Sequence, residues 1–392
     1  MTNGSSITEF LLLAFTDTRE LQLLTFWLFL GIYLAALLGK GLIITTVACD
    51  HRLHTPMYFF LLNLSLLDLG SISTTLPKAM ANSLWGNRAI SYLGCAAQVF
   101  LFVFFISAEY FLLTVMAYDR YVAICKPLHY GSLLGSRACV HMAAAAWGSG
   151  FFYALLHTAN TFSLPLCQGN AVDQFFCELP QILKLSCSDA YLREFRLLVF
   201  SAFAFLACFV FIVLSYVQIF RAVLRIPSEQ GQHKVFSTCL PHLAVVSLFL
   251  STATFAYLKP RSISSPSLNL MVAALYSVVP PAVNPLIYSM RNQELKEAVW
   301  KLMTECFPEA VECGERAIGQ SWSPPYLRNG ECSQPLGKSV PSLSLMTYIV
   351  FVLGKTLIIR QVLANQHLHT PMGFFLGHLS SLEIFYRSTT LP

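Results

Sequence analysis

A long apolar stretch that ends in a pair of opposite charges constrains this chain more than any other feature. Residues 98–116 are predominantly apolar, Asp119 and Arg120 follow at once, and Pro127 lies just beyond them. A helix of about 20 apolar residues spans the hydrocarbon core of a bilayer. The charged pair therefore marks the point where a membrane-spanning helix reaches the lipid headgroups.

Further apolar stretches occur along the chain, and the composition agrees with them. Of the 392 residues, 55% are hydrophobic and 11% are charged, whereas a soluble domain has about 25% charged residues. We therefore expect an all-α membrane protein that is in contact with membrane lipid. The net charge of +5 is small and scattered, so no nucleic-acid partner is expected. The start of the chain lacks the pattern of a removable signal peptide.

The charged pair has two interpretations. It can be a surface salt bridge whose arginine extends toward water. It can also be a switch, in which Asp119 holds Arg120 against its own helix until an inserted peptide offers backbone carbonyls to the guanidinium. Charges at the end of an apolar helix are candidates for function. We expect the switch, and we assign Tyr121, which directly follows Arg120, to the same Asp-Arg-Tyr motif.

The charged pair belongs to the motif Met-Ala-Tyr-Asp-Arg-Tyr at residues 116–121, and two more motifs accompany it. Residues 53–60 read Leu-His-Thr-Pro-Met-Tyr-Phe-Phe, with a proline placed to begin a helix. Residues 284–288 read Asn-Pro-Leu-Ile-Tyr, where a proline within a helix frees a carbonyl and produces a kink. Together the three motifs closely resemble the olfactory receptors of vertebrates, a branch of the rhodopsin-like G-protein-coupled receptors. The resemblance covers about residues 8–307.

The resemblance implies a bundle of seven transmembrane helices within residues 1–307, closed by a short cytoplasmic helix at about residues 292–303. It also implies a plasma-membrane protein with an extracellular N-terminus, where Asn3 begins a glycosylation sequon. Cytoplasmic loops of membrane proteins are enriched in lysine and arginine. The basic residues on the side assigned to the cytoplasm are Arg52, Lys126, Arg137, Arg221, Arg225, Lys234, Arg291, Lys296 and Lys301.

The function that the resemblance implies is binding of a small, mostly apolar odorant and activation of a heterotrimeric G protein with a stimulatory, olfactory-type α-subunit. The C-terminus of that subunit would enter around Arg120 and Tyr216, while Asn284, Pro285 and Tyr288 provide the kink of the seventh helix. A tyrosine at the position of Tyr216 can also be a simple interface anchor. By position, the candidate ligand-binding residues are Phe102, Val103, Ile106, Ser107, Phe200, Ala204, Thr254 and Tyr257. Each of them is also compatible with ordinary packing.

Two acids, Asp68 and Glu109, fall inside apolar stretches. A carboxylate within a membrane needs a partner, and the motifs around these two contain no lysine. We therefore expect a shared proton or a bound sodium ion, and the resemblance implies the sodium site of the receptor family. The alternative is a pair of neutral carboxylic acids bonded to serines such as Ser107. Lys40 stands where the family usually has an asparagine, and its charge is costly at that depth unless it is paired.

Of the 12 cysteines, four fall on the side assigned to the cell exterior. Four cysteines allow three pairings. The family pattern implies the disulfides Cys95–Cys177 and Cys167–Cys187, which would hold the long loop over the mouth of the bundle. No metal site is expected from the spacing of Cys239 and His242, because two ligands cannot complete a tetrahedral site.

Other functional classes fit less well. A transporter would need discontinuous helices and inverted symmetry, which the sequence lacks. An intramembrane enzyme would need a catalytic motif such as His-Glu-x-x-His, and the two intramembrane acids lie among receptor motifs instead. A non-olfactory chemosensory receptor of the same fold is the nearest alternative, because tissue of expression would distinguish the two and sequence does not.

The end of the chain repeats its beginning. After a polar linker at residues 308–342, residues 353–392 align with residues 38–77 without a gap, and more than half of the positions are identical. Residues 343–392 thus resemble the truncated first two helices of a second olfactory receptor. They are either an additional functional element, such as two extra spans or a dimerisation segment, or the product of two neighbouring genes joined in a gene model. We expect the joined genes.

Overall fold

The computed structural model describes residues 8–16, 18–167, 169–187, 191–258, 266–291, 294–295, 297–299 and 301. The chain divides into two units, Met1–Cys306 and Phe307–Pro392. The expected linker and the expected repeat both fall in the second unit, outside the described residues. Asn3 also lies outside them.

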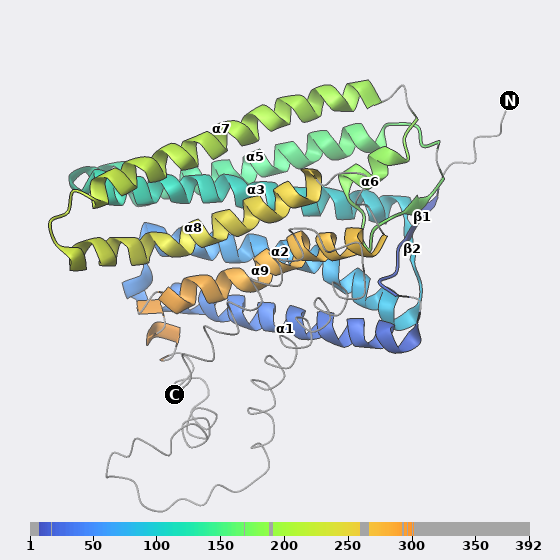
Figure 1. The fold of residues 1–392 in the computed structure, drawn as a ribbon, viewed down its shortest axis with the longest axis horizontal. Coiled ribbons are helices and arrows are strands. Elements are labelled where there is room, and N and C mark those ends of the chain that lie inside the picture. Colours follow the sequence, from blue (N-terminus) through green and yellow to red (C-terminus); the bar gives the residue numbers. More distant parts are fainter. Residues whose placement is uncertain are drawn as a thin grey trace, which may run out of the picture. The chain divides into compact units, whose positions relative to one another are not determined.

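The described part of the first unit contains seven long helices (Figure 1). They are α1 (Arg19–Cys49), α2 (Pro56–Trp85), α3 (Tyr92–Cys125), α5 (Ser136–Phe162), α7 (Tyr191–Val223), α8 (Glu229–Leu258) and α9 (Pro266–Arg291). The first six contain segments long and apolar enough to cross a membrane, and α9 contains the shorter apolar segment Asn269–Asn284. The expected seven-helix bundle is confirmed.

Local sequence explains where these helices begin and end. Pro56 occupies the first turn of α2, where its missing N–H costs no hydrogen bond. Gly86 ends α2 in the left-handed region, at a φ of 70°, which a residue without a side chain adopts easily. The Ser91 hydroxyl caps α3 by accepting a hydrogen bond from the Gly94 N–H at 3.1 Å. Turn chemistry thus separates the second and third spans.

Helix α3 is the centre of the bundle, because it packs against α2, α5, α7 and α8. Helix α1 packs against α2 and α9 instead. Gly150 of α5 lies close to α3, because an added Cβ there would be 2.7 Å from the Ala108 backbone nitrogen. A residue without a side chain is therefore needed at this crossing.

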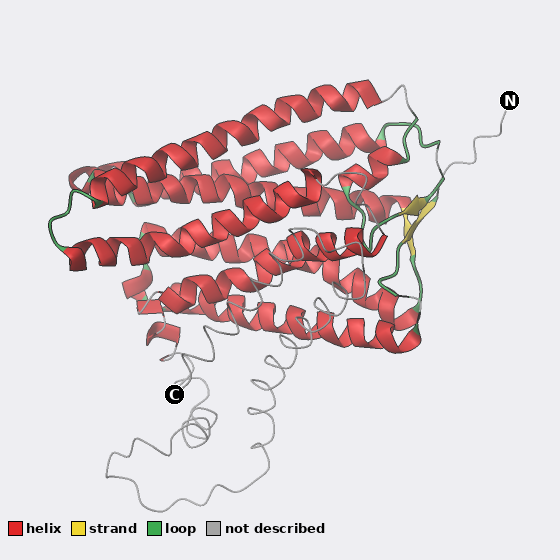
Figure 2. Cartoon of the chain, viewed as in Figure 1, coloured by secondary structure: helices red, strands yellow, loops and turns green. Residues whose placement is uncertain are grey.

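Short elements close both ends of the bundle. The strands β1 (Glu9–Leu12), β2 (Ala89–Ser91) and β3 (Ala171–Val172) form a sheet in the order β2-β1-β3, which the all-α expectation left out. Strand β1 runs antiparallel to β2 and parallel to β3, and Figure 2 shows the sheet at one end of the helices. The helix α6 (Leu179–Lys184) lies in the following loop, and η1 (His51–Leu53), η2 (Pro127–His129) and α4 (Tyr130–Leu133) occupy the other loops.

The expected short helix after α9 is partly described. Glu294, Leu295, residues 297–299 and Lys301 are helical, and Leu295 is fully buried. The Tyr58 hydroxyl donates to Glu294 Oε2 at 2.9 Å, which ties this helix to α2.

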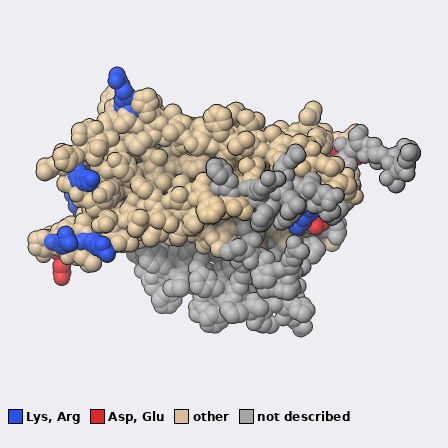
Figure 3. All heavy atoms as spheres, turned by 90° about the horizontal axis from the view of Figure 1, so that it is seen from above, with Lys and Arg blue, Asp and Glu red and all other residues tan. Residues whose placement is uncertain are grey.

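The outer surface of the bundle is suited to lipid. Large apolar side chains such as Trp27, Phe152 and Phe203 are each more than 60% exposed. On the face that Figure 3 shows, the described lysine, arginine, aspartate and glutamate side chains lie at the two ends, and the long middle carries none. An apolar belt between charged ends is the pattern of a membrane-spanning bundle.

Candidate functional site

At the inner end of α3, the Asp119 carboxylate holds Arg120. Arg120 Nε donates to Asp119 Oδ2 at 2.9 Å, and Arg120 Nη2 forms an ion pair with the same oxygen. Asp119 Oδ1 accepts a hydrogen bond from the Tyr130 hydroxyl at 2.9 Å. Asp119 is 1% exposed, so a second donor helps to compensate a carboxylate removed from water. Arg120 is thereby folded against its own helix, as the switch interpretation requires.

A second polar group, centred on His242, joins α3, α7 and α8 farther from the inner end of α3 than Asp119. His242 of α8 lies between the Tyr216 hydroxyl of α7, 2.7 Å from Nδ1, and the Leu113 carbonyl of α3, 3.0 Å from Nε2. A carbonyl only accepts, so Nε2 carries the proton and the Tyr216 hydroxyl donates to Nδ1. In this arrangement the partner of Tyr216 is His242, and Arg120 is held by Asp119 instead.

Of the remaining residues expected at the inner end, the structure describes the side chains of Tyr121 and Asn284. Tyr121 is half-buried, and the Lys126 ammonium lies 5.8 Å from the centre of its ring. Asn284 is buried in the bundle core. The side chains of Pro285 and Tyr288 lie outside the described residues.

The bundle core contains a buried cluster of Lys40, Asp68, Glu109 and Asn284, one residue each from α1, α2, α3 and α9. Lys40 Nζ forms an ion pair with Asp68 Oδ2. Asn284 Nδ2 donates to both Asp68 oxygens, at 3.1 and 3.2 Å, and lies 3.4 Å from Glu109 Oε1. The four residues thus join four helices through one polar network.

This buried cluster corrects two expectations. The expectation that Asp68 has no lysine partner is wrong, because Lys40 lies on α1 and not in the motifs around Asp68. The alternative of neutral acids bonded to serines does not hold for Ser107, since the Ser107 hydroxyl makes no hydrogen bond within the described residues, and the neutrality of the acids stays a prediction. Lys40 meets the condition stated for a lysine at this depth, because it is paired.

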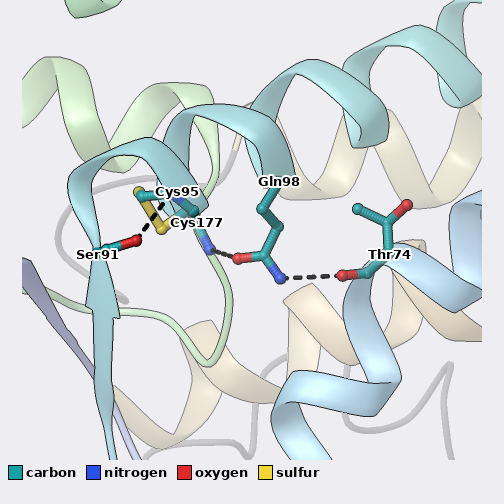
Figure 4. The surroundings of a disulfide bond; sticks show 6 residues. Thr74, Ser91, Cys95, Gln98 and Cys177 are labelled. Atoms are coloured by element: carbon teal, nitrogen blue, oxygen red, sulfur yellow. Dashed lines mark hydrogen bonds between the residues drawn. A yellow bond between two sulfur atoms is a disulfide. The ribbon is translucent and has the colours of Figure 1, made fainter.

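The outer mouth is closed by the long loop between α5 and α7. Both expected disulfides, Cys95–Cys177 and Cys167–Cys187, are formed. Gln98 supports the first of them, as Figure 4 shows: its Oε1 accepts from the Cys177 N–H at 2.9 Å, and its Nε2 donates to the Thr74 carbonyl at 3.0 Å. The loop is therefore fixed to α2 and α3 together.

The same loop is also tied to α9. The Tyr276 hydroxyl donates to Glu178 Oε2, and Gln174 Nε2 donates to the Asn269 carbonyl at 3.2 Å. Burial raises the pKa of the Glu178 carboxyl to about 7, although hydrogen bonds from Gln181 and Gln174 and the charge of Lys184 oppose the rise. The contact between Glu178 and Tyr276 is thus a titratable connection between the loop and the seventh helix.

The candidate ligand-binding residues are only partly brought together. Phe102 is buried, and the centre of its ring lies 5.0 Å from that of Phe176 in the loop and 6.2 Å from that of Tyr276. Val103 and Ile106 are partly buried on the same helix, Ser107 is fully buried, Ala204 is half-buried and Thr254 is exposed. The side chains of Phe200 and Tyr257 lie outside the described residues.

A pocket opens at the outer end of the bundle, and it is formed by other residues. Its lining comes from the segment after β1, from α1, α2 and the two outer loops: Leu13, Ala14, Phe15, Thr16, Gln22, Ala79, Asn82, Ser83, Arg88 and Phe175. None of the candidate residues whose side chains the structure describes contributes to it.

Comparison with known proteins decides the family. The sequence profile of the olfactory receptor family matches residues 29–306. Olfactory receptor 14J1 from Homo sapiens is 49% identical over 314 residues, which cover 80% of this chain and 98% of that receptor. Olfactory receptor 14C36 from Homo sapiens is 47% identical over 307 residues, covering 78% and 98%. The chain belongs to the olfactory receptor family.

This receptor is therefore a multi-pass membrane protein of a receptor class, and its relatives are receptors and not enzymes. The family implies odorant ligands and G-protein coupling in general. A further relative, olfactory receptor 5B21 from Homo sapiens, is 46% identical over 310 residues, covering 79% of this chain and 100% of that receptor.

The sequence interpretation did not identify Tyr130, Gln98 or Glu178 as site residues of this receptor. Gln98 and Glu178 act through partners that are remote in sequence, and Tyr130 reaches back to Asp119 from the short helix α4 in the next loop. Glu178 carried a usable signal, since it is a lone acid directly after a disulfide cysteine and before an apolar segment. The sequence interpretation assigned His242 to no metal site and attributed it to the sixth-helix motif of the family, without a role in the switch.

Proposed function

We propose that this receptor lies in the plasma membrane with its N-terminus outside, binds a small and mostly apolar odorant between its helices, and activates a stimulatory, olfactory-type G-protein α-subunit. One observation carries the proposal. At the inner end, Arg120 and Tyr216 are each held by a partner within the bundle, Asp119 for the first and His242 for the second. Both partners can be exchanged when the helices move apart.

The outer half of the bundle provides the input. A ligand can change the conformation of the bundle only if it binds one arrangement more tightly than the other. Phe102 contacts both the long loop and α9, so a ligand beside it would touch three elements at once. Because the surrounding side chains are mainly aromatic and aliphatic, the ligand is mostly apolar, with at most a few hydrogen-bonding groups.

The inner half provides the output. Movement of the inner end of α8 away from α3 breaks the hydrogen bond between His242 and the Leu113 carbonyl and releases Tyr216. The freed Tyr216 hydroxyl is then available to Arg120, and the guanidinium can cap carbonyls at the C-terminus of the α-subunit. The Asp119–Arg120 contact and the His242–Tyr216 contact thus break together when the cytoplasmic end opens.

Three features support the proposed orientation. Both disulfides lie at the end of the bundle that carries the sheet, and disulfides persist on the oxidising side of a membrane. The opposite end carries the basic loop residues. Asn3 would then face the lumen during synthesis and receive a glycan.

The test is ligand-dependent cyclic AMP production in cells that express the receptor at a measured surface level. We expect at least one small apolar volatile in a broad panel to raise cyclic AMP, and Arg120→Ala to abolish the response at unchanged surface level. Lys126→Ala is the matched control, because Lys126 is a nearby basic residue that faces Tyr121 and takes no part in the Asp119–Arg120 or His242–Tyr216 contact. A response that survives Arg120→Ala would refute the proposed coupling, and a response carried by another α-subunit would refute the subunit assignment.

Residues 343–392 are a separate question. We propose that they come from a neighbouring receptor gene joined to this one, since they repeat the first two helices of the bundle and then stop. The match to the olfactory receptor family ends at residue 306, before the repeat begins.

A further inference from the structure

The buried cluster contains a positive charge where a mobile cation was expected. Lys40 and Asp68 are 1% and 0% exposed, and they form their ion pair in the middle of a membrane-spanning bundle. A buried charge that loses its partner costs several kcal/mol, so these two residues depend on each other. The pair connects α1 to α2, and Asn284 connects it to α9.

The residues present do not fit a sodium ion at Asp68. Two nitrogen donors, Lys40 Nζ and Asn284 Nδ2, already hold its two oxygens, and the Glu109 carboxyl group also makes a hydrogen bond with it. A sodium ion would need the same oxygens as ligands, and it would lie beside an ammonium of like charge. The ammonium already balances one carboxylate. A second cation would therefore gain little and be repelled.

The repeated segment supplies an independent observation. In residues 353–392 the position equivalent to Lys40 is Lys355, and the position equivalent to Asp68 is Glu383. The base and the acid are both kept, while many positions between them differ. Both related sequences in the chain therefore carry a lysine at the first of these positions and an acid at the second.

We infer that the Lys40 ammonium is the built-in cation of this receptor and takes the place of a sodium ion at Asp68. The ammonium is covalently part of α1, so its local concentration does not depend on the surrounding salt. The buried cluster of this receptor is accordingly insensitive to sodium. Removal of the ammonium leaves a buried carboxylate that a sodium ion can then neutralise.

The test compares the thermal unfolding midpoint of the purified receptor in sodium chloride and in N-methylglucamine chloride at equal ionic strength. No odorant is needed, so failure here is distinguishable from failure of the proposed function. We expect no difference for the wild type. For Lys40→Asn we expect a lower midpoint in N-methylglucamine that sodium raises by roughly 2–3 °C, the shift that a ligand at about ten times its dissociation constant produces in a bundle of this size.

Two controls separate this effect from general damage. Lys78→Asn removes another lysine of a membrane helix, whose ammonium donates to the Ala89 carbonyl at 2.7 Å, and it should show no sodium effect. The double variant Lys40→Asn with Asp68→Asn removes both charges. It should lose the sodium effect and unfold at a higher temperature than either single variant.

Two results would overturn the inference. One is a sodium-dependent midpoint in the wild type, because the site would then hold a mobile cation despite Lys40. The other is a Lys40→Asn variant that sodium leaves unchanged. Should Lys40→Asn be too unstable to purify, surface levels in cells decide: recovery in the double variant supports the pairing, and a double variant no better than the single ones refutes it.

Discussion

The hydrogen bonds of His242 lead to the sharpest prediction about signalling. His242 and Tyr216 are 2% and 4% exposed, and the histidine joins α8 to α7 and to the backbone of α3. Replacement of His242 by phenylalanine keeps an aromatic ring of similar size beside Tyr216 and removes both hydrogen bonds. If the open state lacks both bonds, the substitution destabilises only the closed state.

The magnitude follows from the two bonds. A net contribution of about 1 kcal/mol for each hydrogen bond gives about 2 kcal/mol in favour of the open state. Since about 1.4 kcal/mol is a tenfold change, the ratio of open to closed receptor rises roughly 30-fold. A receptor that is open for about 1% of the time without ligand becomes open for about a quarter of the time.

The assay is cyclic AMP production without odorant, normalised to the receptor at the cell surface. We expect His242→Phe to raise it strongly, and His157→Phe to leave it unchanged. His157 is the matched control, because it is equally buried and lies 2.8 Å from the Ser201 hydroxyl, a contact between α5 and α7 that does not involve α8. Unchanged basal signalling by His242→Phe at a normal surface level would show that these bonds do not hold the bundle closed.

Four further predictions concern the loop, the packing and the end of the chain. Because burial raises the pKa of Glu178 from 4.5 to about 7, its contribution to stability is present at low pH and is lost as the pH rises through about 7. The unfolding midpoint should fall between about pH 5 and about pH 8, and Glu178→Gln should flatten this dependence. Cys95→Ser should abolish surface expression, since removal of a native disulfide typically costs about 2–5 kcal/mol. Gly150→Leu should lower the unfolding midpoint, because its side chain would collide with the α3 backbone, whereas the same change at Gly148, where an added Cβ meets nothing within 4 Å, should be mild. Full-length transcript reads should not cross the junction between residues 307 and 345, and a crossing read would disprove the joined-gene explanation.

The sequence was informative wherever one segment carries the whole signal. Apolar length predicts the first six spans, and Pro56 and Gly86 fix the ends of α2 through local turn chemistry. The Asp119–Arg120 contact was also predictable, because both residues lie on one turn. The disulfide pairing was different: four cysteines allow three pairings, and only the family resemblance selected the observed one.

The sequence was uninformative wherever the partner comes from another helix. Asp68 and Lys40 lie on different spans, so inspection of the flanking motifs could not pair them. The small sheet was missed for a related reason, since β3 has only two residues and forms only because β1 lies beside it. Such contacts are set by the order in which the helices pack, which apolar periodicity does not specify.

Helix α9 connects the outer and the inner halves of this arrangement. It carries Tyr276, which contacts Glu178 in the loop, and Asn284, which contacts Asp68 and Glu109 in the buried cluster. These two residues are eight positions apart, or about 12 Å along a helix. A ligand that displaces the loop from Tyr276 therefore acts on the same element that holds the core charges. An ion pair has no partly broken state of low energy in a membrane. A small displacement at the outer end therefore either leaves the buried cluster intact or forces it to rearrange as a whole. A receptor that switches between two states needs this behaviour.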